Sequence, residues 1–195
     1  MAKGAILAHM GHELLESLDG RIGEGWGGEG SAGIHINLVV ARIGSPTAAA
    51  ATAALANPSP GHVPFLVCAG AGSVIRPATV FINKTTLTHP TLEKATWGAA
   101  QLGVAEAVLD AVALQQFPIA SLDELVLLVA VWVDPALQTI ELNPAVETAV
   151  RTASHNAMTA AIFDALTPTD PTTVGALVAK RATITNGFYT GLLEN

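Results

Sequence analysis

Hydrophobic and polar positions alternate along residues 32–41 with the period of a β-strand. Every second residue from Ile34 to Val40 is aliphatic and falls on one face, whereas His35 and Asn37 fall on the other. This pattern predicts a strand with one buried face and one face that carries polar side chains.

Turn and capping residues divide the rest of the chain into further elements. Ser45-Pro46 and Asn143-Pro144 each place a capping residue before a proline, which is typical of a helix start. Apolar runs predict buried strands. The predicted elements are helices at 47–56, 88–115 and 143–166 and strands at 63–70, 78–87 and 125–134. With the first strand they give the order β-α-β-β-α-β-α, which predicts an α/β (α+β) two-layer sandwich with helices over one sheet.

Residues 23–33 are rich in glycine, with six glycines in eleven positions. Gly23, Gly25 and Gly28 match the spacing G-x-G-x-x-G, but a dinucleotide-binding loop needs a strand before it and a helix after it. A predicted strand follows here instead. We therefore reject a nucleotide site and predict a flexible or tightly turned connection.

The 195 residues suit one domain with a remainder at each end. We predict a leader over residues 1–20, in part a short amphipathic helix, and a single domain over 21–167. Residues 168–195 are predicted to be a tail that packs on the body or on a neighbouring subunit.

Charged residues make up 13% of the chain, about half of the usual ~25%. So little charge suggests that other subunits cover part of the surface. Nine Lys and Arg stand against sixteen Asp and Glu, for a net charge of -7. The basic residues are dispersed, which argues against nucleic acid or an anionic membrane as a partner.

The sequence offers no sign of a membrane span, a secretory signal or a metal site. No run of 18 apolar residues exists, and the apolar stretch near Met1 is too short for a signal peptide, so we expect a cytoplasmic protein. The single Cys68 forms no internal disulfide, and the histidines share no metal-ligand spacing, so we expect no metal.

Polar side chains on apolar elements are informative, because burying one without a partner costs roughly 1–3 kcal/mol. His35 and Asn37 form one such pair, and an imidazole exchanges protons near neutral pH. Lys84 and Thr86 form a second pair at the end of an apolar strand. Lys84 could bind a carboxylate or phosphate, or form an imine with an aldehyde. The alternatives are a structural histidine and a lysine that extends over the end of the sheet.

Gln101 interrupts an apolar stripe on the long predicted helix, where its amide needs both a donor and an acceptor. A backbone partner across a subunit boundary and a ligand are equally good explanations. Leu66, by contrast, has the pattern of an ordinary core residue. Pattern alone therefore predicts an α/β domain with a polar cluster of unknown use.

Five short segments occur in a fixed order and spacing: Gly33–Val40, Gly44–Pro46, Asn83–Thr86, Ala100–Ala105 and Leu109–Val112. Together they resemble the formaldehyde-activating enzyme of tetrahydromethanopterin-dependent one-carbon metabolism. Residues 21–113 align with that family without gaps. The resemblance weakens through the last helix and is absent from the leader.

The resemblance implies a lyase that joins formaldehyde to tetrahydromethanopterin and releases water, in one-carbon metabolism and formaldehyde detoxification. It implies no bound metal or prosthetic group, with the pterin as co-substrate. It also implies a left-handed βαβ crossover, as in a ribosomal small-subunit protein domain. The subunits are expected to form a homopentameric ring with active sites at the subunit boundaries.

Carried over residue by residue, His35 matches the catalytic acid of the family. The positions that match its substrate contacts are Asn37, Leu66, Lys84, Thr86 and Gln101. The family has Asp where this chain has Asn37, which keeps the shape and loses the charge. Two other functions therefore stay open: non-catalytic binding of a pterin or aldehyde, and a related condensation on another carbonyl or pterin.

Overall fold

The computed structural model describes residues 15–70 and 72–167, and its strands form one five-stranded sheet with the order β1-β2-β5-β4-β3. All neighbouring strands are antiparallel except β4 and β5, which are parallel. The strands are β1 (Arg21–Gly27), β2 (Ile34–Arg42), β3 (Phe65–Leu66), β4 (Ala78–Asn83) and β5 (Leu125–Val133). Most of the predicted leader and the whole of the predicted tail lie outside the described residues.

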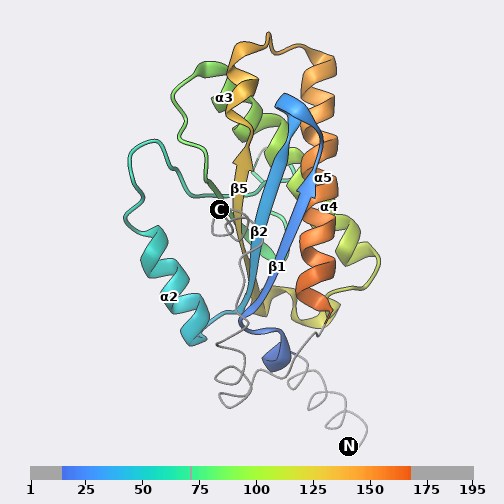
Figure 1. The fold of residues 1–195 in the computed structure, drawn as a ribbon. Coiled ribbons are helices and arrows are strands. Elements are labelled where there is room, and N and C mark those ends of the chain that lie inside the picture. Colours follow the sequence, from blue (N-terminus) through green and yellow to red (C-terminus); the bar gives the residue numbers. More distant parts are fainter. Residues whose placement is uncertain (1–14, 71, 168–195) are drawn as a thin grey trace, which may run out of the picture.

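Helices α4 and α5 pack against each other, and α5 lies along β1 and β2, whereas α2 stands on the other side near the end of β2 (Figure 1). The helices are α2 (Pro46–Leu55), α3 (Pro90–Lys94), α4 (Gln101–Ala113) and α5 (Pro144–Leu166). A π-helical segment, η2 (Ala95–Ala100), joins α3 to α4, and short 3-10 turns are η1 (Gly30–Ala32), η3 (Ile119–Glu124) and η4 (Pro135–Thr139). This arrangement confirms the predicted mixed α/β architecture. None of the described helices is long and apolar enough to cross a membrane.

The predicted alternation of β2 and the predicted helix caps are confirmed. The aliphatic residues at every second position from Ile34 to Val40 are fully buried. Ser45 Oγ accepts a hydrogen bond from the Ala48 amide at 3.1 Å, and the Asn143 side chain caps α5 in the same way.

The prediction of a flexible or tightly turned connection over 23–33 is wrong for residues 23–27, which belong to strand β1, whereas residues 28–33 form the turn to β2. Gly23, Gly25 and Gly27 all face α5, whose backbone lies directly against the strand. A Cβ atom at Gly25 would stand 1.9 Å from the carbonyl oxygen of Ala157. Glycine is therefore required by the close approach of the helix, and the element order begins with an additional strand.

Two predicted strands are shorter than expected. After Leu66 the backbone of residues 67–69 bonds to residues 73–75, so β3 has only two residues and sits at the sheet edge. Strand β4 ends at Asn83, whose buried side chain donates to the carbonyl oxygens of Gly61 and Thr85 and accepts from the Val63 amide. These bonds turn the chain away from the sheet.

The long predicted helix at 88–115 exists in three parts. It begins at Pro90, with His89 as its cap, and ends at Ala113. The six residues of η2 wind as a π-helix between α3 and α4. Such segments are rare and have no periodicity of their own that a sequence would reveal.

The two faces of the sheet differ in how they are covered. One face packs against α4 and α5 and contains the main hydrophobic core. On the other face, α2 covers only one end, through a small cluster around Ala41, Ala48 and Leu128. The end of this second face that no described helix covers, which we call the open face, carries His35.

Candidate active site

Four polar side chains meet on the open face, and they come from three segments. Glu24 lies on β1, His35 and Asn37 lie on β2, and Lys84 follows β4 directly. The register pairs Glu24 with Asn37, and paired residues of neighbouring strands have side chains on the same face. The structure therefore brings together three of the predicted site residues and adds Glu24.

His35 joins Lys84 to Glu24 through its two ring nitrogens. Lys84 Nζ lies 2.8 Å from His35 Nδ1, and His35 Nε2 lies 2.6 Å from Glu24 Oε1. A lysine ammonium group only donates hydrogen bonds, so Nδ1 is the acceptor. The ring proton is therefore on Nε2, which donates a hydrogen bond to the Glu24 carboxylate. The three groups form one continuous hydrogen-bonded path across the sheet.

Burial lowers the pKa of His35 below its ordinary value of 6.5, and the neighbouring Lys84 charge lowers it further. The hydrogen bond and the charge of Glu24 act in the opposite direction but are smaller influences. Trp26 stacks on the imidazole with a centroid distance of 3.9 Å, and only 6% of His35 is exposed. The imidazole is therefore predominantly neutral at neutral pH.

Backbone and side-chain bonds fix the position of Lys84. Its amide donates to the Val131 carbonyl oxygen at 2.7 Å, and the hydroxyl of Thr85 donates to the Val133 carbonyl oxygen at 2.6 Å. The bonds of Asn83 described above hold the preceding residue. Lys84 Nζ also donates to Asn37 Oδ1 at 2.9 Å. Burial lowers the pKa of Lys84 to about 8, against the attraction of the Glu24 carboxylate.

The other predicted site residues do not join this cluster. Thr86 is exposed, and its hydroxyl lies 3.3 Å from His62 Nε2. The prediction that Leu66 has a core position is wrong, because it lies on the edge strand β3 and is 48% exposed. Gln101 donates to the Cys68 carbonyl oxygen at 3.0 Å, which is a backbone partner within the same chain.

Sequence reasoning missed Glu24 and Trp26 because it treated their segment as a connection. The alternation of glycine with larger residues along Gly23–Gly27 is a period of two, which is the signal that could have revealed the strand. In that register Glu24 and Trp26 necessarily share a face.

The described residues contain no group of three or more side chains suited to hold a metal ion. The cluster instead unites a cation, a neutral imidazole and a carboxylate in hydrogen-bond contact. Such an arrangement moves a proton between donor and acceptor without changing its total charge.

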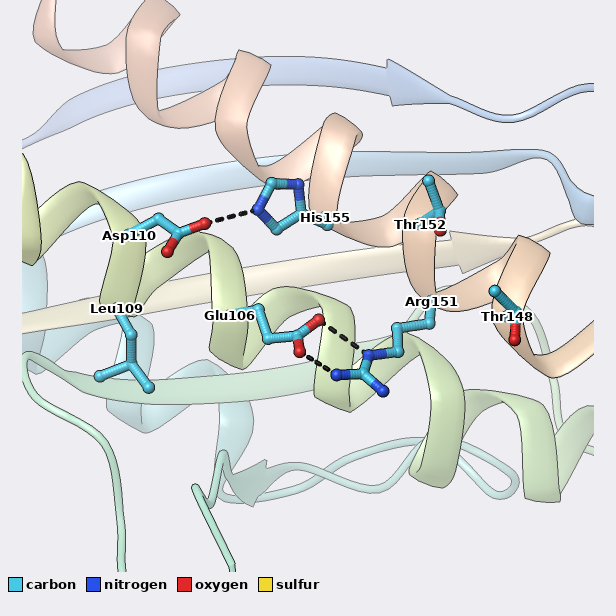
Figure 2. Close-up of a pocket in the computed structure, with 7 residues that line it drawn as sticks. All are labelled: Glu106, Leu109, Asp110, Thr148, Arg151, Thr152 and His155. Atoms are coloured by element: carbon cyan, nitrogen blue, oxygen red, sulfur yellow. Dashed lines mark hydrogen bonds and ion pairs between the residues drawn. The ribbon is translucent and has the colours of Figure 1, made fainter.

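A hollow of about 580 Å³ lies elsewhere, between α4 and α5, and its walls carry charged groups in pairs (Figure 2). Glu106 pairs with Arg151, and the bonds from Arg151 lower the pKa of Glu106. Asp110 lies 2.9 Å from His155 Nε2. Each acid on α4 is thus satisfied by a base on α5, so these residues connect the helices, and we place the candidate site on the open face.

Comparison with known proteins identifies the family. The family model described as formaldehyde-activating enzyme (Fae) matches residues 22–189. The 5,6,7,8-tetrahydromethanopterin hydro-lyase of Methanosarcina barkeri is 32% identical over 132 residues, which are 68% of this chain and 72% of that protein. The bifunctional enzyme Fae/Hps of Archaeoglobus fulgidus is 36% identical over 115 residues, which are 59% of this chain but only 29% of that enzyme. This chain therefore belongs to the formaldehyde-activating enzyme family.

Proposed function

We propose that this chain is a lyase that condenses formaldehyde with tetrahydromethanopterin to methylene-tetrahydromethanopterin and water. Its place would be in one-carbon metabolism and formaldehyde detoxification in the cytoplasm. Family membership supports the reaction class. The observation that carries the proposal is the hydrogen-bonded path from Lys84 through His35 to Glu24 on the open face.

In the proposed reaction, His35 delivers the proton that the departing hydroxyl group needs. Formaldehyde adds to one pterin amine and gives a carbinolamine, whose hydroxyl leaves as water once it is protonated. The proton comes from His35 Nε2, while Lys84 supplies a proton to Nδ1, so that the imidazole stays neutral throughout. The second pterin amine then closes the ring, and the proton that it releases passes to Nε2 while Nδ1 returns its proton to Lys84. General acid help of this kind contributes about 10²–10⁴-fold to the rate.

Glu24 has to release Nε2 before the carbinolamine can receive its proton. The Glu24 side chain is 41% exposed, so it has room to turn toward solvent when the substrate hydroxyl takes its place. Once the product leaves, the Glu24 carboxylate again accepts the hydrogen bond from His35 Nε2. Glu24 thus acts as a positioning residue that keeps the proton of the neutral imidazole on Nε2.

The pterin is proposed to contact Asn37, Leu66, Lys84, Thr86 and Gln101, as a co-substrate rather than a bound cofactor, and no metal takes part. Leu66 and Gln101 stand apart from the His35 cluster of their own chain, and Leu66 is half-exposed. We therefore propose that a neighbouring subunit completes each site in a homo-oligomeric ring, of five subunits as the resemblance implies. The exposed apolar side chains of Ile22 and Trp26 on the open face support such a contact. The left-handed βαβ crossover remains part of this proposal.

Non-catalytic binding of a pterin or an aldehyde is the second candidate function. The burial of His35 beneath Trp26 favours it, because a buried imidazole with both nitrogens engaged resembles a structural residue. A related condensation on another carbonyl or pterin is a third candidate, favoured by Asn37 in place of the family Asp.

The direct test is the rate at which the purified full chain consumes formaldehyde with tetrahydromethanopterin, measured above the spontaneous rate. The same chain, unfolded beforehand, is the control for reaction with surface amines. We expect a pterin-dependent excess over both backgrounds. Pterin binding without any excess rate would support the binding function instead. Light scattering on the same sample tests the ring, and a monomer at micromolar concentration would contradict it.

A further inference from the structure

We infer that Lys84 is a nucleophile that takes up formaldehyde as a covalent iminium before the pterin amine receives the carbon. Transfer from Lys84 then replaces the direct addition of formaldehyde to the pterin amine described above. The transfer to the pterin rests on the proposed function. The capture of formaldehyde itself requires only this chain and the aldehyde, so the two parts can fail separately.

The contacts of the Lys84 ammonium group carry this inference. Its two hydrogen-bond acceptors, His35 Nδ1 at 2.8 Å and Asn37 Oδ1 at 2.9 Å, are both uncharged. Among the ion pairs of the described residues, none includes Lys84. The carboxylate of Glu24 bonds to the far nitrogen of the imidazole rather than to the lysine. Within residues 15–70 and 72–167, no directly bonded negative charge therefore holds the proton on Lys84.

The burial of Lys84 and its lowered pKa support a role as a nucleophile. The side chain is half-buried on the open face, and burial lowers its pKa to about 8 despite the opposing charge of Glu24. Roughly a tenth of such a group is free amine at neutral pH, against fewer than about one in a thousand for an ordinary lysine. The acceptor Nδ1 of His35 lies within direct reach to take the proton that the amine must lose.

The chemistry balances within the cluster. Lys84 passes a proton to His35 Nδ1, and its amine adds to the formaldehyde carbon, forming a C–N bond while the C=O π bond breaks. The addition gives a carbinolamine after a proton moves from nitrogen to oxygen. The imidazolium then protonates the hydroxyl group, water leaves, and the lysine nitrogen becomes an iminium. Overall, ammonium plus formaldehyde gives iminium plus water, with no change in charge.

Transfer to the pterin follows by exchange of one amine for another. A secondary amine of the pterin adds to the iminium carbon, and the resulting aminal expels Lys84 as a free amine. The carbon now forms an iminium on the pterin, which the second pterin amine closes to the methylene product, and the proton that this amine loses passes to the Lys84 amine. Lys84 returns to its starting state without any oxidant or reductant.

The identity of residue 37 makes the inference specific to this chain. Asn37 Oδ1 accepts a bond from Lys84 as a neutral amide. An aspartate at this position would place a negative charge about as close to the ammonium group and would raise the pKa of the lysine. Asn37→Asp is therefore a variant of the same shape that should suppress capture at neutral pH.

The test traps the iminium by reduction. The full-length protein is mixed with formaldehyde and cyanoborohydride at neutral pH, and peptide mass spectrometry follows the appearance of one methyl group on each lysine. The exposed Lys94 serves as the internal reference. Lys84 should gain its methyl group at least about tenfold faster than Lys94, because burial lowers the pKa of Lys84 and raises its fraction of free amine. In Asn37→Asp this advantage should fall, and its pH dependence should move upward by about one unit or more.

Equal trapping rates at Lys84 and Lys94 would overturn the inference, and so would an Asn37→Asp variant that traps as fast as the unmodified protein. Lys84→Arg keeps the cation but forms no iminium, so methylation at position 84 must disappear in it. Pterin-dependent condensation without trapping at Lys84 would overturn the inference and leave the proposed lyase standing. Trapping without condensation would support the capture site and contradict the lyase.

Discussion

The two faces of strand β1 have different roles, and alternate residues of the strand belong to each face. On one side, Gly23, Gly25 and Gly27 let the α5 backbone come so close that no side chain fits. On the other side, Glu24 bonds to His35 and Trp26 stacks over it. Packing on the helix side therefore requires residues without a side chain, whereas the contacts on the other side are a charged hydrogen bond and a ring stack.

This difference separates stability from chemistry along a single strand. Substitutions on the helix side should lower the stability of the folded protein, because α5 can move away from a new side chain only if the closely packed core around it also moves. Changes on the open side should act on the site, because Glu24 and Trp26 are partly exposed and contribute little to the core. The four predictions that follow test this separation.

The largest effect is expected from Gly25→Val on the helix side. The new Cβ would overlap the Ala157 carbonyl, so α5 must move, and we expect a loss of at least about 3 kcal/mol or a failure to fold. Gly98→Ala is the matched control, because a Cβ there meets nothing within 4 Å. It should be neutral or stabilise the helix by up to about 1 kcal/mol. Chemical denaturation measures both, and equal stabilities would contradict the close-packing account.

On the open side, Glu24→Gln should lower kcat about tenfold or more while the thermal midpoint changes little, since part of the acid effect depends on a correctly placed imidazole. The Glu24 charge raises the pKa of His35, so the acidic limb of the rate profile should also move to lower pH. Glu29→Gln changes an exposed carboxylate in the turn after β1 and serves as the control. A pH profile that does not move in Glu24→Gln would assign Glu24 a purely structural role.

A smaller effect is expected in the pH dependence of stability. The folded protein holds the pKa of His35 below its ordinary value of 6.5. As the pH falls below about 6.5, His35 is therefore protonated in the unfolded chain before it is protonated in the folded protein. The contribution of neutral His35 to stability is complete above about pH 6.5 and is lost as the pH falls toward and through the lowered pKa of the folded state. From about pH 7 to about pH 5, the thermal midpoint should fall further for the unmodified protein than for His35→Gln. Parallel curves for the two proteins would show that His35 is not held neutral.

The smallest effect is expected between the helices. Asp110 pairs with His155 at the exposed rim of the hollow between α4 and α5. Asp110→Asn should change the free energy of unfolding by less than about 0.5 kcal/mol and should leave the rate unaltered. A marked loss of activity in this variant would show that the hollow, rather than the open face, contains the site.

The sequence predicted the central strands well, because their hydrophobic pattern is strong. Strand β2 alternates cleanly, and β5 is an unbroken apolar run with one face buried and the other face mostly half-buried. Strand β1 was missed because glycine weakens a strand and is usually a signal of turns. Its glycines are explained only by α5, which lies more than a hundred residues away in the chain.

The candidate site was predictable only in part for the same reason. His35 and Lys84 stood out as polar residues on apolar elements, and both lie in the cluster. Glu24 could not be placed beside them without the register of β1. The separation of Leu66 and Gln101 from the cluster depends on sheet order, which no local pattern reveals.

The measurement that tests the central claim most directly compares the unmodified protein with His35→Ala in pterin-dependent formaldehyde condensation. If the open-face cluster delivers the proton, His35→Ala should lose the excess over the spontaneous rate while it still binds the pterin, so that the loss appears in kcat. An excess rate that survives in a folded His35→Ala protein would contradict the claim that the chemistry takes place at this cluster.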